Sequence, residues 1–341
     1  MSNVNNDRLF ANRERADLPD RPTLAVVVDT EEEFDWNAPF SRQATGVTAM
    51  RHIDRVQRLC DAVGLEPTYV IDYPVATQPD GYGAISGWAK EGRCRIGAHL
   101  HPWVTPPFDE IVSGPNSFMC NLAPSLQRAK MRELCDAIVQ NTGATPRVFK
   151  AGRYGISHEA LSAFDELGLA VDVSVNPCMN FAADSGPDFS HFDSHPFWIE
   201  RTKGLLEVPC THGFIGWARR QGLRLRNAAE SLRIPRGPGI LSRAGAVNRV
   251  MLSPEGNTLN EMTALTRTLL ADGLTMFSLT FHSPSVVPGH TPYVRSQAEL
   301  SAFLTTIERY FEFFFGELGG QPSTPERLHH SLFGTLPTTH V

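Results

Sequence analysis

Short apolar segments with strand character alternate along this chain with segments of helical periodicity. The run at residues 23–28 is rich in β-branched side chains, as are strands that are buried on both faces. The segments between such runs carry apolar residues at helical spacing, as at residues 53–63. Alternation of this kind implies a parallel sheet with crossover helices, that is, an α/β fold. The expected strands are residues 23–28, 68–71, 94–101, 147–149, 169–171, 205–208 and 275–281.

Two stretches interrupt this alternation and are expected to be irregular insertions, at about residues 176–204 and 211–249. Residues 1–20 are polar and without periodicity, which predicts a flexible N-terminal arm. Residues 21–320 are expected to form a single domain, and residues 321–341 a C-terminal tail. The chain has 341 residues, a length that suits one large domain.

Composition narrows the classes of protein to which the chain can belong. The formal net charge of −6 argues against a general nucleic-acid binder. None of the six cysteines forms a Cys-x-x-Cys pair, which favours reduced thiols over a disulfide framework. The polar N-terminus lacks the apolar core of a signal peptide, and no stretch has the length needed to span a bilayer. We therefore expect a cytoplasmic protein without a transmembrane segment.

The strand expected at residues 94–101 ends in two histidines. Side chains two residues apart on a strand point to the same side, so His99 and His101 project together, and Pro102 ends the strand just after them. Two imidazoles aimed at one point are an arrangement typical of metal ligands. A single His-x-His motif is also common in ordinary strand–loop junctions, so the remaining strand ends decide between the two interpretations.

Ionisable residues also stand at the ends of three other expected strands. Asp29 and Glu31 share one face after the first strand, Lys150 follows residues 147–149, and His282 follows residues 275–281. Active sites of parallel α/β barrels lie at this end of the strands. Two histidines and a carboxylate make a facial metal site, while a second carboxylate and a further histidine suit a general base and a general acid. A cation beside the base would keep it ionised.

In this order the motifs resemble those of the polysaccharide deacetylases, the NodB-homology family of carbohydrate esterases. The resemblance spans about residues 22–290 and rests on five segments, each of which stands where the family has a motif. Several stretches, among them IGAHLHPW at 96–103 and KAGRYG at 150–155, are most similar to the subgroup named after the lipopolysaccharide-biosynthesis protein WalW. The five segments are VVDTE at 27–31, HLHP at 99–102, FKAGRYG at 149–155, VDVS at 171–174 and TFH at 280–282.

The resemblance implies a distorted (β/α)7-type barrel, with insertions, that removes N-acetyl groups from amino sugars with the help of a divalent metal ion. Zinc is the expected ion, with cobalt, nickel or manganese as alternatives. The substrate would be a polysaccharide or a lipid- or nucleotide-linked precursor of lipopolysaccharide. Carried over by position, Asp29 is the base and His282 the acid, and either Lys150 or Arg153 orients the base. Glu31, His99 and His101 are the metal ligands, and the backbone of Tyr154 helps to bind the substrate oxyanion.

This chain departs from the family pattern at three positions. The paired aspartates of the family become Asp-x-Glu, so the acidic ligand is Glu31 or Glu32. The spacing of the histidines shrinks from four residues to two, which leaves open whether both reach the metal. The arginine of the third motif is replaced by Lys150. An amidohydrolase-type barrel acting on a small amide, with Lys150 as a carbamylated ligand, and a glycan-binding relative without catalysis remain alternatives.

Further residues are expected to contact the substrate or a membrane. Trp103 and His290 lie near the motifs and are candidates for sugar binding. The segment Arg219 to Arg249 contains eight arginines and only one acidic residue, Glu230. Such a basic segment in an acidic protein suits a phosphorylated or lipid-linked glycan, or an anionic membrane surface. A solvated, flexible basic loop is the alternative interpretation.

Overall fold

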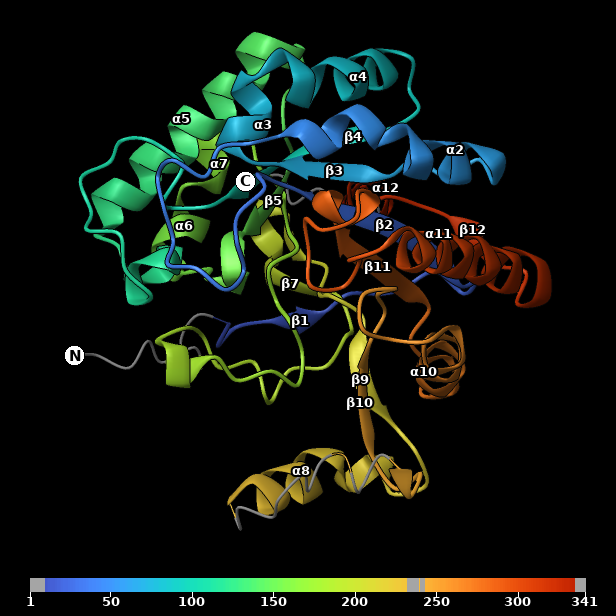
Figure 1. The fold of residues 1–341 in the computed structure, drawn as a ribbon. Helices are drawn as coiled ribbons and strands as arrows, with labels where there is room; N and C mark the ends of the chain where they lie inside the picture. The colour runs from blue at the N-terminus through green and yellow to red at the C-terminus, as the bar shows by residue number, and fades with distance from the viewer. Residues whose placement is uncertain (1–9, 232–238, 240–242, 335–341) are drawn as a thin grey trace.

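The computed structural model describes residues 10–231, 239 and 243–334. Within them the chain forms a curled, mainly parallel sheet with helices packed on its outer side (Figure 1). Seven of the described strands run parallel in the order β11-β2-β3-β4-β5-β6-β8, which confirms the expected α/β barrel architecture. These strands are β2 (Thr23–Thr30), β3 (Thr68–Ile71), β4 (Arg95–Leu100), β5 (Val148–Ala151), β6 (Val171–Asp172), β8 (Leu205–Glu207) and β11 (Met276–His282).

The crossover helices lie between the strands as the apolar periodicity predicts. Two of these connections contain two helices each: α3 and α4 lie between β3 and β4, and α6 and α7 lie between β5 and β6. No helix among the described residues combines the length and the apolarity that crossing a membrane requires. The helices are α2 (Asp54–Ala62), α3 (Tyr73–Thr77), α4 (Pro79–Lys90), α5 (Pro124–Thr142), α6 (His158–Ser162), α7 (Phe164–Leu167), α8 (Gly222–Ser231), α10 (Leu259–Ala271), α11 (Gln297–Phe311) and α12 (Pro325–Phe333).

Strand β2 shows how the fold places polar groups at the end of a buried core. All eight of its residues are buried. Val26 and Val28 pack in the larger apolar cluster beneath the helices, while Ala25 and Val27 pack in a second cluster on the other face. Asp29 continues the series of Ala25 and Val27, because residues two apart share a face. On the face of β2 that carries the second cluster, the apolar residues are therefore followed by a carboxylate at the carboxyl end of the sheet.

The two insertions contain regular structure. The first contributes β7 (Phe197–Glu200), which runs antiparallel to β8 at the edge of the sheet. The second forms a hairpin of β9 (His212–Ile215) and β10 (Asn248–Met251), which projects from the barrel and carries α8 at its far end (Figure 1). Arg233 and Arg236 of this insertion lie outside the described residues. We call residues 212–231 and 243–251 the basic arm.

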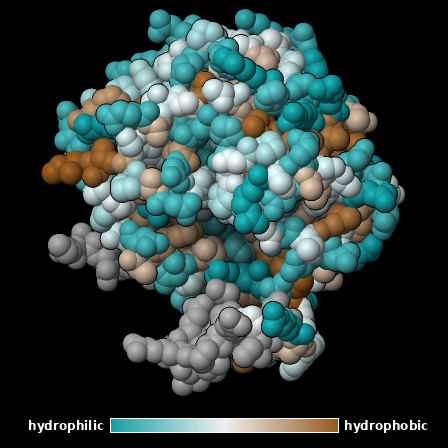
Figure 2. All heavy atoms as spheres, viewed as in Figure 1, coloured by the Kyte–Doolittle hydropathy of each residue, from teal (hydrophilic) through white to brown (hydrophobic). Residues whose placement is uncertain are grey.

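Both ends of the described chain pack on the barrel. Phe10 is buried among aromatic rings, and β1 (Glu14–Arg15) pairs with β7, so this part of the expected N-terminal arm lies against the sheet. At the other end, β12 (Gln321–Pro322) pairs with β2, and α12 follows a Thr324 cap. Polar residues cover most of the face drawn in Figure 2, and hydrophobic residues are scattered among them.

Candidate active site and metal centre

A cavity of about 500 Å³ opens at the carboxyl ends of the parallel strands. This is the end at which barrel enzymes of this class build their sites. Its wall contains the ionisable residues that the sequence singled out at four separate strand ends. Those residues are Asp29, Glu31, His99, His101, Lys150 and His282, and all but His282 are at least nine-tenths buried.

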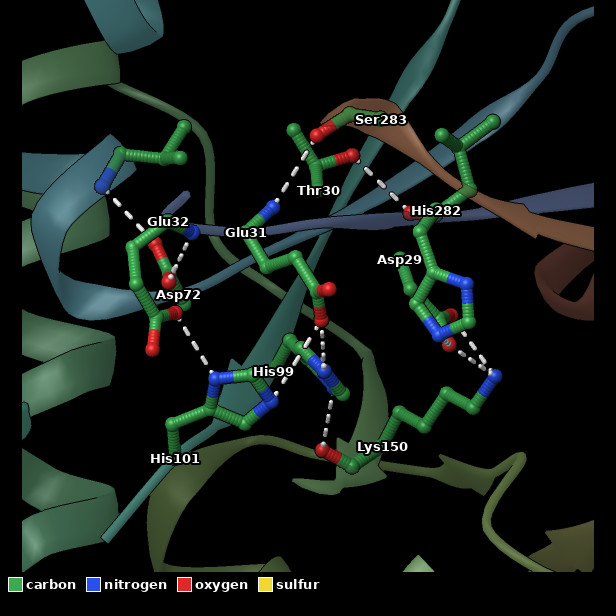
Figure 3. Close-up of polar contacts among 12 residues, drawn as sticks. Asp29, Thr30, Glu31, Glu32, Asp72, His99, His101, Lys150, His282 and Ser283 are labelled. Carbon is green, nitrogen blue, oxygen red and sulfur yellow. Dashed lines mark hydrogen bonds and ion pairs between the residues drawn. The ribbon is translucent and has the colours of Figure 1, made fainter. Parts of the chain in front are cut away.

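Glu31, His99 and His101 point to one spot (Figure 3). The Oε2 atom of Glu31 lies 3.4 Å from Nε2 of His99 and 3.5 Å from Nε2 of His101. The three ligand atoms lie within 4.8 Å of one another, as needed for one ion. The other oxygen of Glu31 is buried without a hydrogen-bond partner. A buried carboxylate with an unsatisfied oxygen, facing two imidazole nitrogens, fits a divalent cation.

The far side of each imidazole explains why its Nε2 atom is available. Nδ1 of His99 lies 3.1 Å from the carbonyl oxygen of Lys150, which can only accept a hydrogen bond, so Nδ1 carries the proton. Nδ1 of His101 likewise donates to Oε2 of Glu32 over 2.8 Å. Burial lowers the pKa of both imidazoles and keeps them neutral. Both Nε2 atoms therefore present a lone pair towards Glu31, as metal ligands do.

Glu32 lies behind His101 and is held on every side. Its Oε1 atom accepts the indole N–H of Trp103 over 2.8 Å, and its backbone N–H donates to Asp72 over 2.7 Å. Glu32, Asp72 and His101 form a second group with the spacing of a metal site. Both oxygens of Glu32 are already satisfied by His101 and Trp103, whereas Glu31 has an unsatisfied oxygen. The geometry thus favours Glu31 over Glu32 as the acidic ligand.

Burial shapes the charge of Glu31. It raises the pKa of this carboxyl to about 8, because removal from water disfavours the charged form unless a positive charge lies beside it. A bound cation supplies that charge. The raised pKa and the unsatisfied oxygen are therefore two consequences of one feature, a buried carboxylate with room for a positive partner.

Asp29 and Lys150 form a buried ion pair beside this group. Nζ of Lys150 lies 2.7 Å from both oxygens of Asp29 and 3.3 Å from the hydroxyl of Thr280. Burial on its own would raise the pKa of Asp29, but the charge and hydrogen bond of Lys150, together with the nearby His99 and His282, outweigh that effect and hold the pKa below its ordinary value. Asp29 is consequently an ionised carboxylate inside the cavity.

His282 stands on the other side of Asp29 and is anchored by Glu255. Nδ1 of His282 lies 2.7 Å from Glu255, and Nε2 lies 3.9 Å from Asp29. Burial on its own would lower the pKa of His282, but the carboxylates of Glu255 and Glu31 raise it to about 10. The ring of Trp36 packs nearly perpendicular to the imidazole, with ring centroids 5.1 Å apart. His282 is therefore a positioned, protonated imidazole with Nε2 facing the cavity.

The remaining candidates take different positions. The guanidinium of Arg153 contacts Ser117, Phe118 and Phe40 rather than Asp29. Tyr154 lines the cavity. Trp103 is only 2 % exposed and stacks on His101 at 4.3 Å, so it supports that imidazole. His290 is not in the cavity wall, and its Nδ1 lies 3.6 Å from Glu33.

Two residues of the site escaped the sequence reasoning. Glu255 lies in the loop between β10 and α10, far from any motif, and no local pattern marks it. Asp72 stands directly after β3. The strand-end rule that selected Asp29 applies equally to Asp72, so that signal was present. Asp72 also caps α3 by accepting the backbone N–H of Val75.

No family model matches the chain, and no curated protein matches it. Solved structures, in contrast, do match this chain. A candidate polysaccharide deacetylase from Mycobacterium smegmatis aligns with a TM-score of 0.52 and 13 % identity, over 96 % of this chain and 98 % of that one.

Two further structures are described as carbohydrate esterases of family 4. The esterase domain of a multidomain xylanase from the hindgut metagenome of Trinervitermes trinervoides has a TM-score of 0.44 and 10 % identity, over 94 % of this chain and 95 % of that one. The Streptomyces lividans enzyme, solved with acetate, has a TM-score of 0.40 and 11 % identity, over 90 % and 95 %. The chain therefore shares its fold with the mycobacterial protein, a barrel of the NodB type.

Proposed function

We propose that this chain is a metal-dependent hydrolase that removes N-acetyl groups from an amino sugar and releases acetate. The observation that carries the proposal is the arrangement around one cavity of three kinds of group. A cation site of Glu31, His99 and His101 lies next to an ionised carboxylate, Asp29, and a protonated imidazole, His282. Hydrolysis of an amide requires an electrophile, a base and an acid, and these groups supply them.

Glu31, His99 and His101 would hold a divalent ion, which would supply Lewis acidity for the acetamide carbonyl and the attacking water molecule. Asp29 accepts the proton of the attacking water, and Lys150 keeps it ionised and fixes its orientation. His282 donates the proton from Nε2 to the leaving amine nitrogen, while Glu255 holds Nδ1. The amide C–N bond breaks, and acetate and a free amino sugar are the products.

The walls of the cavity suit a sugar ring. Trp36, Tyr293 and Tyr154 line it with aromatic surface, and aromatic rings pack well on the apolar faces of sugars. We further propose that the backbone N–H of Tyr154 binds the developing oxyanion. Zinc suits a site with two imidazoles and a carboxylate, and cobalt, nickel and manganese are the other candidates.

The basic arm supports a proposal about the source of the substrate. Trp217 is 81 % exposed, and Arg220, Arg224 and Arg243 of the same arm are also exposed. Tryptophan and arginine together are typical of surfaces that lie on anionic lipid. We propose that the arm rests on an anionic, cytoplasmic membrane face and that the substrate is a lipid-linked precursor of a polysaccharide or lipopolysaccharide. The WalW-like subgroup is the corresponding expectation among the deacetylases.

Two alternatives to this function make different demands on the site. An amidohydrolase needs Lys150 as a carbamylated metal ligand, whereas the amino group of Lys150 is bound to both oxygens of Asp29. A glycan-binding relative without catalysis needs no base or acid, whereas both are held in place here by charged partners. The deacetylase accounts for all of these contacts.

An acetate-release assay tests the proposal. The purified protein is stripped with a chelator, reloaded with Zn²⁺, Co²⁺, Ni²⁺ or Mn²⁺, and offered N-acetylated glycans and lipid- or nucleotide-linked precursors. We expect acetate only from the reloaded protein. Acetate release that is indifferent to the chelator contradicts the metal site, and no release from any substrate by a protein that binds the metal favours the binding relative.

A further inference from the structure

Arg153 has a cationic head group that the proposed reaction does not use. Its Cζ atom lies 4.0 Å from the ring centroid of Phe118 and 5.2 Å from that of Phe40. Its Nη1 atom donates to the hydroxyl of Ser117 over 2.5 Å and to the carbonyl of Gly114 over 3.4 Å. The guanidinium is therefore fixed by two rings and two neutral oxygens, and it lines the cavity that holds the metal centre.

The guanidinium of Arg153 contacts no counter-ion in the described part of the chain, and Asp184 acts on it only from beyond ion-pair distance. The residue forms no ion pair with any described carboxylate within 4 Å, and its only hydrogen bonds there come from Nη1. Nε and Nη2 of Arg153 donate no hydrogen bond within the described residues, and neither atom is fully buried. Half-burial of an arginine without a counter-ion is unfavourable, and a negative charge arriving from the cavity would remove that cost.

The backbone at Arg153 is held in an energetically unfavourable conformation. Arg153 and Tyr154 have φ angles of 53° and 63°, and non-glycine residues seldom adopt this left-handed conformation. Strain of this kind gathers at functional sites. Gly152, just before them, packs so closely on His101 that a Cβ atom there would lie 2.3 Å from the imidazole. The strained turn thus begins in contact with His101, and Arg153 is the next residue along the chain.

A row of rings connects the guanidinium with the metal centre. Phe40, which contacts Arg153, lies 4.5 Å from the ring of Trp103, and Trp103 stacks on His101. A sugar whose acetamido group reached Glu31 and the histidines would extend along this row. Its neighbouring substituent, or the next sugar unit, would then meet Nε and Nη2 of Arg153.

We propose that Arg153 binds an anionic group of the substrate, a carboxylate or a phosphate, and that the amino sugar is therefore deacetylated as part of an acidic glycan. This inference rests on the proposed deacetylase function and names the substrate class of that same site. Arginine suits the role because its planar fork donates two parallel hydrogen bonds to either anion. Lys150 cannot take it, since Asp29 already occupies its amino group.

Matched sugars and matched variants test the inference. N-Acetylglucosamine is compared with its 1-phosphate, its 6-phosphate and N-acetylmuramic acid, which separates phosphate from carboxylate. The variants are Arg153→Met and Arg153→Lys. The control is Arg147→Met, because Arg147 is an exposed arginine that directly precedes β5, whereas Arg153 follows the carboxyl end of that strand. The readout is the ratio of kcat/KM for each anionic sugar to that for the neutral sugar.

We expect a ratio well above one for at least one anionic sugar in the wild type and in Arg147→Met. In Arg153→Met the ratio should fall by about ten- to a hundredfold, the usual worth of hydrogen bonds to a charged group. Arg153→Lys keeps the charge without the fork and should retain part of the preference, which also covers the case in which Arg153→Met does not fold. A wild-type ratio of one or less, or a ratio that Arg153→Met leaves unchanged, overturns the inference.

Binding measured by calorimetry separates this inference from the proposed function. If none of the sugars is deacetylated, the deacetylase proposal fails for this class of substrate. The anion site still predicts that an anionic sugar binds the wild type and Arg147→Met more tightly than Arg153→Met. Equal binding to the three proteins, or no binding of any anionic sugar, contradicts the anion site itself.

Discussion

Nζ of Lys150 lies 2.7 Å from both carboxylate oxygens of Asp29, although strands β3 and β4 separate β5 from β2 in the sheet. The pair therefore spans the interior of the curled sheet rather than joining neighbouring strands. Both side chains are buried, with 2 % and 5 % of their surface exposed. The ion pair thus ties the curvature of the sheet to the charge state of the proposed base.

Breaking this pair should cost stability, and removing both partners should cost less. Lys150→Met leaves a buried carboxylate without its cation, so we expect a loss of about 3–5 kcal/mol in the free energy of unfolding. The double variant Asp29→Asn/Lys150→Met should be more stable than Lys150→Met alone. Urea unfolding measures both, with the exposed Lys90→Met as the control. A double variant no more stable than Lys150→Met argues against a buried charge pair.

Glu255→Gln should shift the pH dependence of acetate release. The charge of Glu255 helps to raise the pKa of His282, so its removal lowers that pKa. A general acid must be protonated, and the activity is therefore lost at a lower pH on the basic side of the profile. The pH profile of kcat/KM measures the shift, and the exposed Glu308→Gln is the control. A basic limb that stays in place means that His282 is not the acid whose protonation limits the rate.

The strand ends could be predicted because the rules behind them are local. Alternation along a buried strand places Asp29 after Ala25 and Val27 and pairs His99 with His101, whatever the rest of the chain does. The parallel order then brings the separate strand ends to one edge. The seven-stranded architecture followed from the same short patterns.

The partners of these residues could not be predicted, because they depend on loops that come together only in the fold. Glu255 reaches His282 from a loop without a motif. The sequence left open whether Lys150 or Arg153 orients the base. The backbone at Arg153 is left-handed, which the residue types there do not predict, and its guanidinium contacts Ser117 instead. The hairpin and helix of the basic arm were also missed, since its dense arginines hide short apolar patterns.

The buried acids Asp172 and Glu207 predict a second pH effect, on stability. They stand opposite each other on β6 and β8, and one oxygen of each has no hydrogen-bond partner. Burial raises the pKa of both carboxyls. The charge of Asp172 raises the pKa of Glu207 further, whereas the hydrogen bond with Glu207 lowers the pKa of Asp172 without cancelling the effect of burial. A carboxyl group whose pKa is raised in the folded state contributes to stability. That contribution to the free energy of unfolding is fully present below the ordinary carboxyl pKa of about 4 and is lost as the pH rises through the folded-state pKa.

We therefore expect the free energy of unfolding to fall as the pH rises above about 4, by about 1.4 kcal/mol for each unit by which a pKa is raised. Asp172→Asn replaces one acid with an amide that can donate to Glu207, and it should make this fall shallower. Denaturant unfolding between pH 4 and 8 measures the slope, with the exposed Asp193→Asn as the control. Identical slopes for wild type and Asp172→Asn would show that the two acids do not share a proton.

The basic arm predicts binding to anionic vesicles. Trp217→Ala and the triple change Arg220→Gln, Arg224→Gln and Arg243→Gln should each weaken sedimentation with vesicles that contain phosphatidylglycerol. Each arginine near such a surface is worth about 1 kcal/mol, and added salt should weaken binding in the wild type. Neutral vesicles and the variant Arg128→Gln, on the far α5, are the controls. If the wild type does not sediment with anionic vesicles at low salt, the proposed membrane contact is wrong.

The most direct test of the central claim is to count the products of the metal-loaded protein. Acetate and free primary amine are measured together on an N-acetylated glycan, for the wild type and for Asp29→Asn. Hydrolysis of the amide predicts equal amounts of the two products, and loss of the base predicts a rate lower by about 10²- to 10⁴-fold. Metal content, measured in the same samples, should stay the same because Asp29 is outside the ligand group. Acetate without amine, or an Asp29→Asn variant as fast as the wild type, contradicts the account.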